Sequence, residues 1–305
     1  DEDKDLMKLV LNKGAERIKD LEDQPEVEAS IRSILGEAYY SLGFYDEAFE
    51  HHGRSLSIRL ELFGPNDLDV ADSYNGIGVM YDHRSEHDKA LEHYHKALEI
   101  RLNKLGQEHP YVATSYNNIG GVYGVKGDYN KALEYHQKSL AIELKTKGSN
   151  HIDVATSYNN IGVVYDNQGE HDKALEYYQR ALAIDIKQMG ADHPDVATSY
   201  NNIGTVYDNK FEHDKALEYF RKALVIWLKQ LGPDHLDVAT SYNNIAAGHD
   251  SKGEHDKALE NNQKALEIRL NKLGPSHPDV ATSYNNIGVA HDNKGEYDKA
   301  LENYQ

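Results

Sequence analysis

Apolar residues recur at helical spacing in a segment that the chain repeats. In one copy, Val196, Tyr200, Ile203 and Tyr207 follow one another at intervals of four, three and four residues. This spacing places the four side chains on one face of an α-helix, whereas a half-buried strand would alternate apolar and polar residues. The segment therefore predicts a helix with a single apolar stripe.

The same segment returns at a fixed distance along the sequence. Each equivalent tyrosine lies 42 residues after the previous one, and these are Tyr74, Tyr116, Tyr158, Tyr200, Tyr242 and Tyr284. A fixed period of about 20–50 residues is typical of solenoids and propellers, and the helical spacing favours a solenoid. We expect full repeats to begin near residues 69, 111, 153, 195, 237 and 279.

Each repeat contains two predicted helices. In residues 191–232 the first, helix A, begins near Pro194 and runs to about Tyr207, and the second, helix B, spans about residues 214–231. Most repeats have a glycine in the turn between them, which suits a left-handed backbone conformation. Neither helix can bury its apolar stripe alone, so stacking on neighbouring repeats must form the core. The prediction is an all-α solenoid of helical hairpins.

Both ends depart from this repeat. Residues 1–24 predict a separate helix, and residues 27–64 a degenerate first repeat, within one solenoid of residues 1–305. The apolar residues of the N-terminal helix are Leu6, Leu9, Val10, Ile18 and Leu21. The last repeat is truncated inside its helix B, where Leu301 and Tyr304 would face an unfilled space. We expect either further repeats beyond this end or homo-association through it.

Composition narrows the classes of protein and partner. The 305 residues include no cysteine, which excludes disulfides and thiolate metal sites, and the formal net charge is −18. Such a negative charge argues against nucleic acid and anionic membrane surfaces as partners. No apolar run approaches the roughly 20 residues that span a bilayer, and from these residues we expect no signal peptide. We therefore expect a cytoplasmic protein.

The two helices of a repeat carry a family signature. Its residues in one repeat are Tyr200, Ile203, Gly204, Tyr207, Ala216, Phe220 and Ala223. This pattern resembles the tetratricopeptide repeat, and the period of 42 with the motifs LGPDH and NNIG resembles the long repeats of kinesin light chains. The resemblance implies a right-handed superhelix whose A helices line a concave groove for proteins or extended peptides, without catalysis or a cofactor. Residues 12–48 also resemble segments that follow the kinase domain in some bacterial serine/threonine kinases.

A polar stripe on helix A is the candidate binding surface, because the resemblance places it on the groove. It contains two adjacent asparagines in each repeat, which are Asn117 and Asn118, Asn159 and Asn160, Asn201 and Asn202, Asn243 and Asn244, and Asn285 and Asn286. Thr156, Thr198, Asp166 and Asp208 lie on the same stripe. An asparagine amide can donate to and accept from a peptide backbone, and the second asparagine matches a position where family members hold ligand backbone. The alternative is that these amides bond to neighbouring repeats or only solvate the surface.

The charge of the A helices departs from family members that bind acidic peptides. From the second repeat onward the A helices carry no lysine or arginine, while aspartates such as Asp166 and Asp208 recur at their ends. A neutral to acidic groove favours neutral or basic ligands over acidic ones.

The remaining unusual residues are histidines and two aromatics. The histidines repeat before helix A and before helix B, so helix starts explain them better than a metal site, and we expect no metal. Phe211 stands where most repeats have glycine, and Trp227 replaces a charged residue. Both are candidates for exposed contacts, although Trp227 could instead pack flat against a neighbouring helix.

These patterns leave four functions to weigh. A non-enzymatic binding scaffold is favoured, and a regulatory or sensing arm of a larger signalling protein, such as a bacterial kinase, is compatible with it. A self-stacking structural oligomer is a third possibility. An enzyme would need a catalytic constellation that breaks the symmetry of the repeat, and the sequence offers none.

Overall fold

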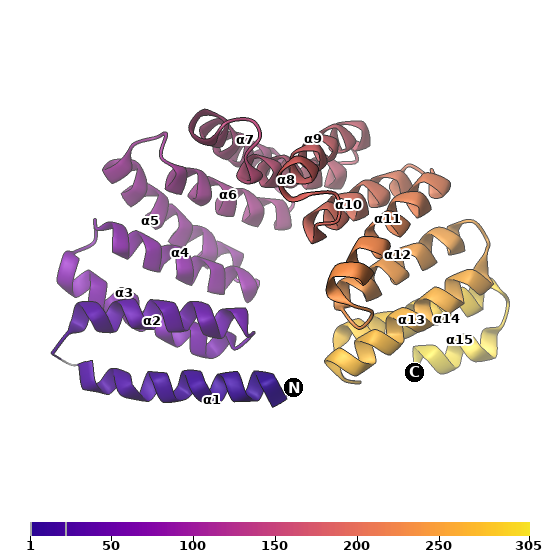
Figure 1. Ribbon diagram of the computed structural model, residues 1–305, viewed down its shortest axis with the longest axis horizontal. Helices are drawn as coiled ribbons and strands as arrows, with labels where there is room; N and C mark the ends of the chain where they lie inside the picture. Colours follow the sequence, from indigo (N-terminus) through magenta and orange to yellow (C-terminus); the bar gives the residue numbers. More distant parts are fainter. Residues whose placement is uncertain (1, 22) are drawn as a thin grey trace. The chain divides into compact units, whose positions relative to one another are not determined.

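The computed structural model describes residues 2–21 and 23–305 (Figure 1). Every regular element in these residues is helical, which confirms the all-α prediction. The elements are α1 (Glu2–Glu16), the 3₁₀ helix η1 (Arg17–Leu21), α2 (Pro25–Ser41), α3 (Tyr45–Phe63), α4 (Leu68–His83), α5 (His87–Leu105), α6 (Pro110–Val125), α7 (Tyr129–Lys147), α8 (Ile152–Asn167), α9 (His171–Met189), α10 (Pro194–Asn209), α11 (His213–Leu231), α12 (Leu236–Ser251), α13 (His255–Leu273), α14 (Pro278–Asn293) and α15 (Tyr297–Tyr304).

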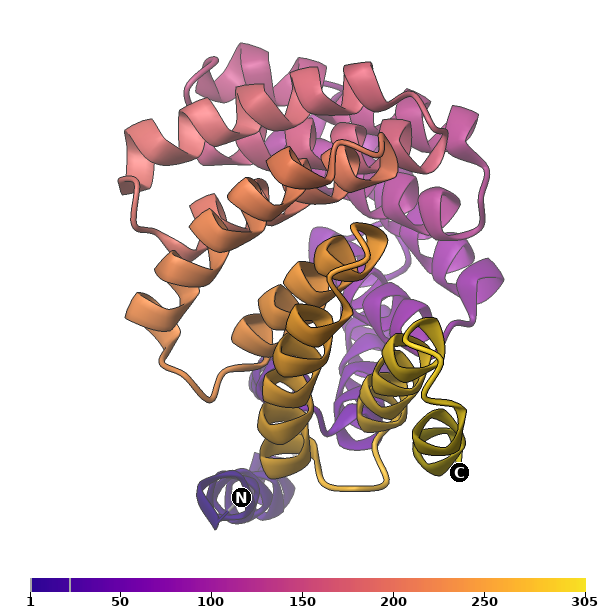
Figure 2. The ribbon, with the colours of Figure 1, turned by 90° about the vertical axis from the view of Figure 1, so that its right-hand side faces the viewer.

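The chain divides into two compact units, residues 1–146 and 147–305. From α2 onward, even-numbered helices are the A helices and odd-numbered helices are the B helices. Within each unit, helix A lies beside helix B of its own repeat, and helix B packs against the next helix A, as α3 does on α4 and α11 on α12 (Figures 1 and 2). Each unit is therefore a stack of helical hairpins, as predicted. The continuation of one solenoid from the first unit into the second stays a prediction.

The repeated histidines have local structural roles at helix starts. The Nδ1 atom of His193, the N-cap of α10, accepts a hydrogen bond from the backbone N–H of Asp195 at 3.2 Å. This bond satisfies one of the amide groups that a helix start leaves unpaired. At the start of α11, the Nδ1 atom of His213 lies 2.7 Å from Oδ1 of Asp208, the residue near the end of the preceding helix A. Among the described residues, no group of three metal-ligating side chains is close enough to hold an ion.

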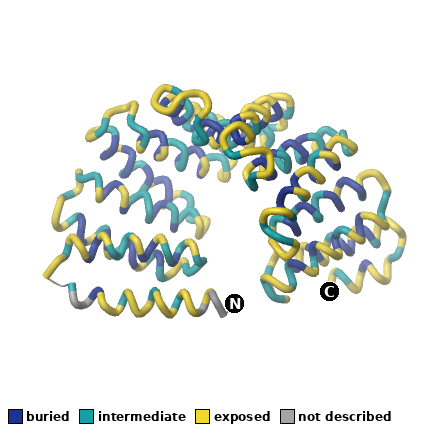
Figure 3. Tube along the Cα trace, viewed as in Figure 1, coloured by how far each residue is buried: buried dark blue, intermediate teal, exposed yellow. Residues whose placement is uncertain are grey.

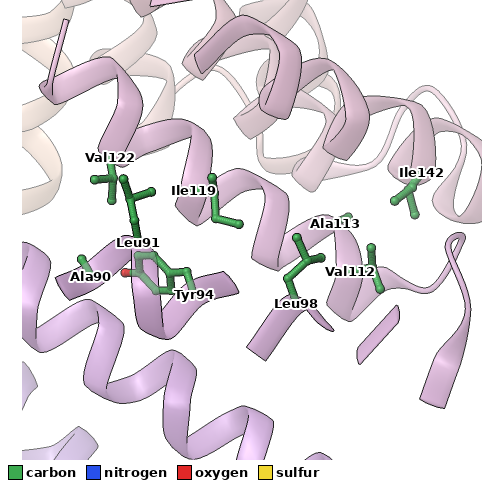
Figure 4. Close-up of a cluster of buried hydrophobic side chains, with 9 residues drawn as sticks. All are labelled: Ala90, Leu91, Tyr94, Leu98, Val112, Ala113, Ile119, Val122 and Ile142. Atoms are coloured by element: carbon green, nitrogen blue, oxygen red, sulfur yellow. The ribbon is translucent and has the colours of Figure 1, made fainter. Parts of the chain in front are cut away.

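Apolar side chains from successive helices meet between the hairpins. In the first unit, Tyr94 and Leu98 of α5 pack with Ile119 and Val122 of α6 and with Ile142 of α7 (Figure 4). All five are buried. The buried positions fall where helices face one another, and the loops are mostly exposed (Figure 3). Removal of this apolar surface from water stabilises the stack by roughly 25 cal/mol per Å².

Glycine on helix A lets the aromatic ring of helix B approach its backbone. A Cβ atom added to Gly78 would lie only 2.6 Å from the ring of Tyr94, and one added to Gly204 would lie 2.7 Å from Phe220. Both distances are below any ordinary carbon contact, so a side chain at these glycines would push the hairpin apart. The glycine and the ring, recognised in the sequence as a family signature, thus form one contact.

The N-terminal segment differs from the predicted 24-residue helix. The α-helix ends at Glu16 and continues as the 3₁₀ helix η1, while residues 1 and 22 lie outside the described residues. Leu6, Leu9 and Val10 are at least half exposed, and only Ile18 of the predicted apolar stripe is fully buried. The correction has a simple cause, because α1 and η1 have only one neighbouring hairpin. Ile18 of η1 is buried against it beside Leu35 and Tyr39, while Leu11 and Ala15 of α1 are only partly buried there.

The last helix, α15, leaves part of its apolar face uncovered. Leu301 and Tyr304 are 57% and 46% exposed. Homo-association through this face stays a prediction.

The turn between α10 and α11 contains a strained residue. Glycines at the equivalent turns, such as Gly169, have φ near +76°, in the left-handed region. Phe211 occupies this position with φ of +60°, and its side chain is 83% exposed. A residue with a Cβ atom pays about 1 kcal/mol for this conformation, while an exposed ring recovers little by packing.

We predict that Phe211→Gly raises the free energy of unfolding by about 1 kcal/mol, because glycine adopts the left-handed conformation without steric cost. Urea unfolding followed by circular dichroism measures the change. The matched control is Gly169→Phe, which should lower stability by a similar amount. A destabilised Phe211→Gly protein would mean that the ring contributes packing that outweighs the strain.

Candidate functional site

The paired asparagines form amide–amide hydrogen bonds between consecutive repeats. In the second unit, Nδ2 of Asn202 donates to Oδ1 of Asn159 at 2.9 Å, and Asn244 donates in the same way to Asn201 at 2.8 Å. The same bond joins Asn286 to Asn243, and in the first unit it joins Asn118 to Asn75. We call this series the amide ladder. These bonds correspond to the second interpretation of the asparagine stripe, in which the amides bond to neighbouring repeats.

The amide ladder leaves hydrogen-bonding capacity unused. A primary amide has two N–H donors and two acceptor lone pairs, and one ladder bond occupies a single donor of Asn202 and a single lone pair of Asn159. These side chains are half-buried, and Asn285 is exposed. The ladder therefore holds the amides in fixed orientations beside solvent. Their use by a ligand stays a prediction.

The other residues of the predicted stripe also have local partners. The hydroxyl groups of Thr156 and Thr198 donate to the backbone carbonyls four residues earlier, at 3.3 Å each. The Asp166 carboxylate accepts a hydrogen bond from Asn209 and lies 2.9 Å from Nδ1 of His171. Asp208 is placed equivalently beside its own histidine. The recurring aspartates thus carry negative charge on the stripe but are held by neighbouring side chains.

Hollows open along this stripe. In the second unit one of about 130 Å³ is lined by Thr156, Asn159 and Thr198, and one of about 230 Å³ by Asn243 and Asn286 among others. The first unit has a hollow of about 410 Å³ between α2 and α4, which we call the α2–α4 hollow. These hollows show that the stripe is accessible in both units.

Of the two alternatives for Trp227, exposure is wrong and packing against a neighbouring helix is confirmed. Its side chain is only 4% exposed and packs in a cluster with Ile226, Val238 and Ala265. The prediction failed because the polar residues at the equivalent position of other repeats, which suggested an exposed site, are mostly buried themselves. Phe211, in contrast, is exposed as expected, and its role as a contact stays a prediction.

The buried polar position forms a hydrogen bond that sequence reasoning missed. Nη1 of Arg101 donates to Oγ of Ser115 at 2.7 Å, and the Ser199 hydroxyl donates to the Asp185 carboxylate at 3.1 Å. In both pairs the serine lies on the next helix A, 14 residues later. Burial raises the pKa of the Asp185 carboxyl group, and the Ser199 bond opposes this rise. A polar residue followed by serine at this spacing was the available sequence signal.

Trp227 breaks this hydrogen bond in its repeat. The serine 14 residues later is Ser241, whose Oγ atom is buried without a partner in the described part of the chain. A buried hydroxyl without a hydrogen bond costs about 1–3 kcal/mol.

We predict that Ser241→Ala raises the free energy of unfolding by about 1 kcal/mol, because it removes a desolvated hydroxyl that has no partner. Ser115→Ala is the matched control and should lower stability by about 2 kcal/mol, because it removes a hydrogen bond from the buried Arg101. Denaturant unfolding of both variants measures the difference. Equal destabilisation by the two substitutions would contradict the assignment.

A histidine occupies the ring position of helix B in two repeats of the first unit. His136 packs under Gly120, where later repeats have Tyr178 and Phe220, and its Nδ1 atom lies 2.7 Å from Oδ1 of Asn117. Burial lowers its pKa from 6.5 to about 4. The unfolded chain therefore binds a proton near pH 6.5 that the folded chain accepts only near pH 4. The stability from the neutral ring is complete above pH 6.5 and is lost as pH falls toward 4.

We predict that His136→Phe reduces the loss of stability between pH 7 and pH 5 by about 2 kcal/mol, because phenylalanine has no proton to bind. Urea unfolding at the two pH values measures this loss. Tyr178→Phe, at the same position of the next repeat, should leave the loss unchanged. An unaltered loss in the His136 variant would show that this ring does not titrate on unfolding.

One family model matches this chain along most of its length. The family model described as Tetratricopeptide repeat matches residues 27–103, 82–142, 111–187, 153–224, 195–271 and 252–305. No curated protein matches the sequence. In the described residues, no helix is both long and apolar enough to cross a membrane.

Several solved structures share the fold. BtubC (BKLC) from P. vanneervenii is 22% identical, with a TM-score of 0.59 over 72% of this chain and 85% of that chain. A putative kinesin light chain from Podosopora anserina, with nearly identical TPR-like repeats, is 21% identical, with a TM-score of 0.57 over 68% of this chain and 98% of that chain. The apo form of RapI is 19% identical, with a TM-score of 0.69 over 91% of this chain and 95% of that chain. At these identities the likeness concerns the fold alone.

Proposed function

Because the chain belongs to the tetratricopeptide repeat family, we propose that it is a non-catalytic scaffold that binds proteins or extended peptides along its A helices. The observation that carries this proposal is the amide ladder. It presents similarly oriented donors and acceptors at successive repeats in both units, for example at Asn159 and Asn202. Such a series suits a peptide backbone, whose N–H and C=O groups also repeat at regular intervals.

The charges along the stripe support neutral or basic ligands. The A helices from α4 onward carry no lysine or arginine, and Asp166 and Asp208 add carboxylates to the stripe. Like charges brought together at an interface cost free energy, whereas opposite charges raise the association rate and the selectivity. Exposed Phe211 is an additional candidate contact at the end of α10.

A second candidate is that the scaffold forms the regulatory or sensing arm of a larger signalling protein, such as a bacterial serine/threonine kinase. It is favoured by the resemblance of residues 12–48 to segments of such kinases. Sequencing the gene on both sides of this segment tests it, and an upstream region without a kinase domain would contradict it.

We predict that a peptide array probed with the protein shows stronger binding to neutral and basic extended peptides than to acidic ones. For the strongest peptide, Asn285→Ala should weaken binding about fivefold, the equivalent of about 1 kcal/mol for one hydrogen bond. Asn285 is chosen because it is exposed and outside the hydrogen-bonded pairs of the ladder. Isothermal titration calorimetry measures the affinity.

The control for this experiment is Asn261→Ala, on helix B, where the amide bonds to its own backbone. It should leave peptide affinity unchanged. Equal loss in both variants would contradict binding along the A helices, and a preference for acidic peptides would contradict the charge argument.

A further inference from the structure

Two arginines occupy the same position in consecutive repeats of the first unit but differ in their counter-charge. Arg101 donates from Nη1 to Oγ of Ser115 and to the backbone carbonyl of Tyr111, at 2.7 and 3.3 Å. Its Nη2 atom forms an ion pair with Oδ1 of Asp72 at 2.7 Å. Asp72 lies on the preceding helix A, 29 residues earlier in the sequence. The Arg101 guanidinium therefore has both hydrogen-bond partners on the next helix A and a carboxylate partner on the preceding one.

Arg59 has the first kind of partner but lacks the second. Its Nη1 atom donates to Oγ of Ser73 and to the backbone carbonyl of Asp69, at 2.8 and 3.0 Å. The residue 29 positions earlier is Ser30, whose hydroxyl bonds to the carbonyl of Glu26. Within the described ranges, no carboxylate forms an ion pair with Arg59, although the residue is only 8% exposed. A buried cation without a counter-charge destabilises the fold, and an incoming anion would relieve this.

The α2–α4 hollow lies beside this arginine. Arg59 and Arg101 both line it, together with His52 and Tyr40. Its volume of about 410 Å³ is sufficient for an acidic side chain or a small organic acid. Burial lowers the pKa of His52 to about 4, so the ring is neutral at physiological pH and Arg59 supplies the unpaired charge.

A glycine removes one side chain from the lining of the hollow. Gly76, which lines it, stands where later repeats have the second asparagine of the amide ladder. One repeat later, Asn118 reaches back to Asn75 and donates a hydrogen bond to it. At Gly76 no side chain can reach back to Ser33, which also lines the hollow. Gly76 therefore interrupts the amide ladder and leaves the polar side chains that line the hollow accessible.

We propose that the α2–α4 hollow binds a carboxylate group, which pairs with Arg59 as the Asp72 carboxylate pairs with Arg101. The bound group is either an acidic residue of a peptide or a small organic acid, and the recognising chemistry is the same. A guanidinium favours carboxylates because its planar donors match the two oxygens. The hollow is lined by Ser33 and Asn75 of the A helices, so the peptide form of this inference rests on the proposed scaffold function. The small-acid form does not.

The charges around the hollow are consistent with a single carboxylate. Asp72 is held by Arg101, and Glu37 is exposed on α2, so neither occupies Arg59. The rest of the stripe still favours neutral or basic residues. A ligand that fits both features is an extended segment with one acidic residue among neutral or basic neighbours.

The test follows the arginine Nε–Hε signals by ¹⁵N NMR while sodium acetate replaces sodium chloride at constant ionic strength. We expect a saturable shift of the Arg59 signal, and Arg59→Met should reduce the affinity for acetate at least tenfold. Arg269→Met is the matched control, because Arg269 makes the same serine bond but is half-exposed. It should leave acetate binding unchanged. In the Arg59→Met variant, the signal of Arg101, which also lines the hollow, reports acetate binding. An Arg101 shift that persists unchanged in Arg59→Met, or that chloride reproduces, would overturn the proposal.

A second variant places the missing carboxylate within the protein. Ser30→Asp puts an acid 29 residues before Arg59, in the relation of Asp72 to Arg101, at an exposed position of α2. It should raise the melting temperature and abolish the acetate response. If Ser30→Asp binds acetate as the unmodified protein does, the ion-pair geometry proposed for Arg59 is wrong.

Two capped peptides distinguish the sources of the carboxylate. They share one neutral-to-basic sequence and differ only in a central glutamate or glutamine. Tighter binding of the glutamate peptide, lost in Arg59→Met, supports both the carboxylate site and the peptide scaffold. Acetate binding without any peptide binding supports the site as a receptor for small acids and contradicts the scaffold function at this position.

Discussion

The close approach of helix B to the backbone of helix A is the contact on which the rest of the structure depends. The ring of Phe220 lies directly over Gly204, where even one methyl group would clash. This contact fixes the distance between the two helices of a hairpin and therefore the faces they offer to the next repeat. Tyr178 over Gly162 and Tyr94 over Gly78 repeat the arrangement, so successive hairpins present nearly identical surfaces.

Between hairpins, polar bonds set the register that apolar packing alone would leave loose. The hydrogen bond between helix B and the serine 14 residues later, as in Arg101 and Ser115, is buried and directional. The amide ladder adds a second bond on the A helices, and ion pairs such as Lys210 with Asp172 add a third at the surface. Exposed ion pairs contribute little free energy, so the buried hydrogen bonds contribute most to fixing the register between hairpins. Trp227 shows the cost of losing one, because Ser241 is then left without a partner.

Departures from the repeat are the most informative residues of this chain. An exact repeat would present a uniform surface, on which a ligand could bind in several equivalent registers. Gly76 and Ser30, which leaves Arg59 without a carboxylate partner, break this uniformity in the first unit, and Phe211 and Trp227 break it in the second. A ligand that uses such a departure is held in one register, which is how a repetitive scaffold gains selectivity.

The sequence by itself determined the local structure. Apolar spacing located each helix pair, glycines such as Gly169 marked the turns, and the recurring histidines were recognised as helix-start residues, because each of these features depends on residues only a few positions apart. The tertiary structure alone decided which polar residues are buried. Arg59, Asp185 and Trp227 are covered by the neighbouring repeat. Arg59 and Asp185 bond to a serine on the next helix, and Trp227 leaves the equivalent serine, Ser241, without a partner. Burial and counter-charge depend on residues 14 to 43 positions away, which a pattern within one helix does not contain.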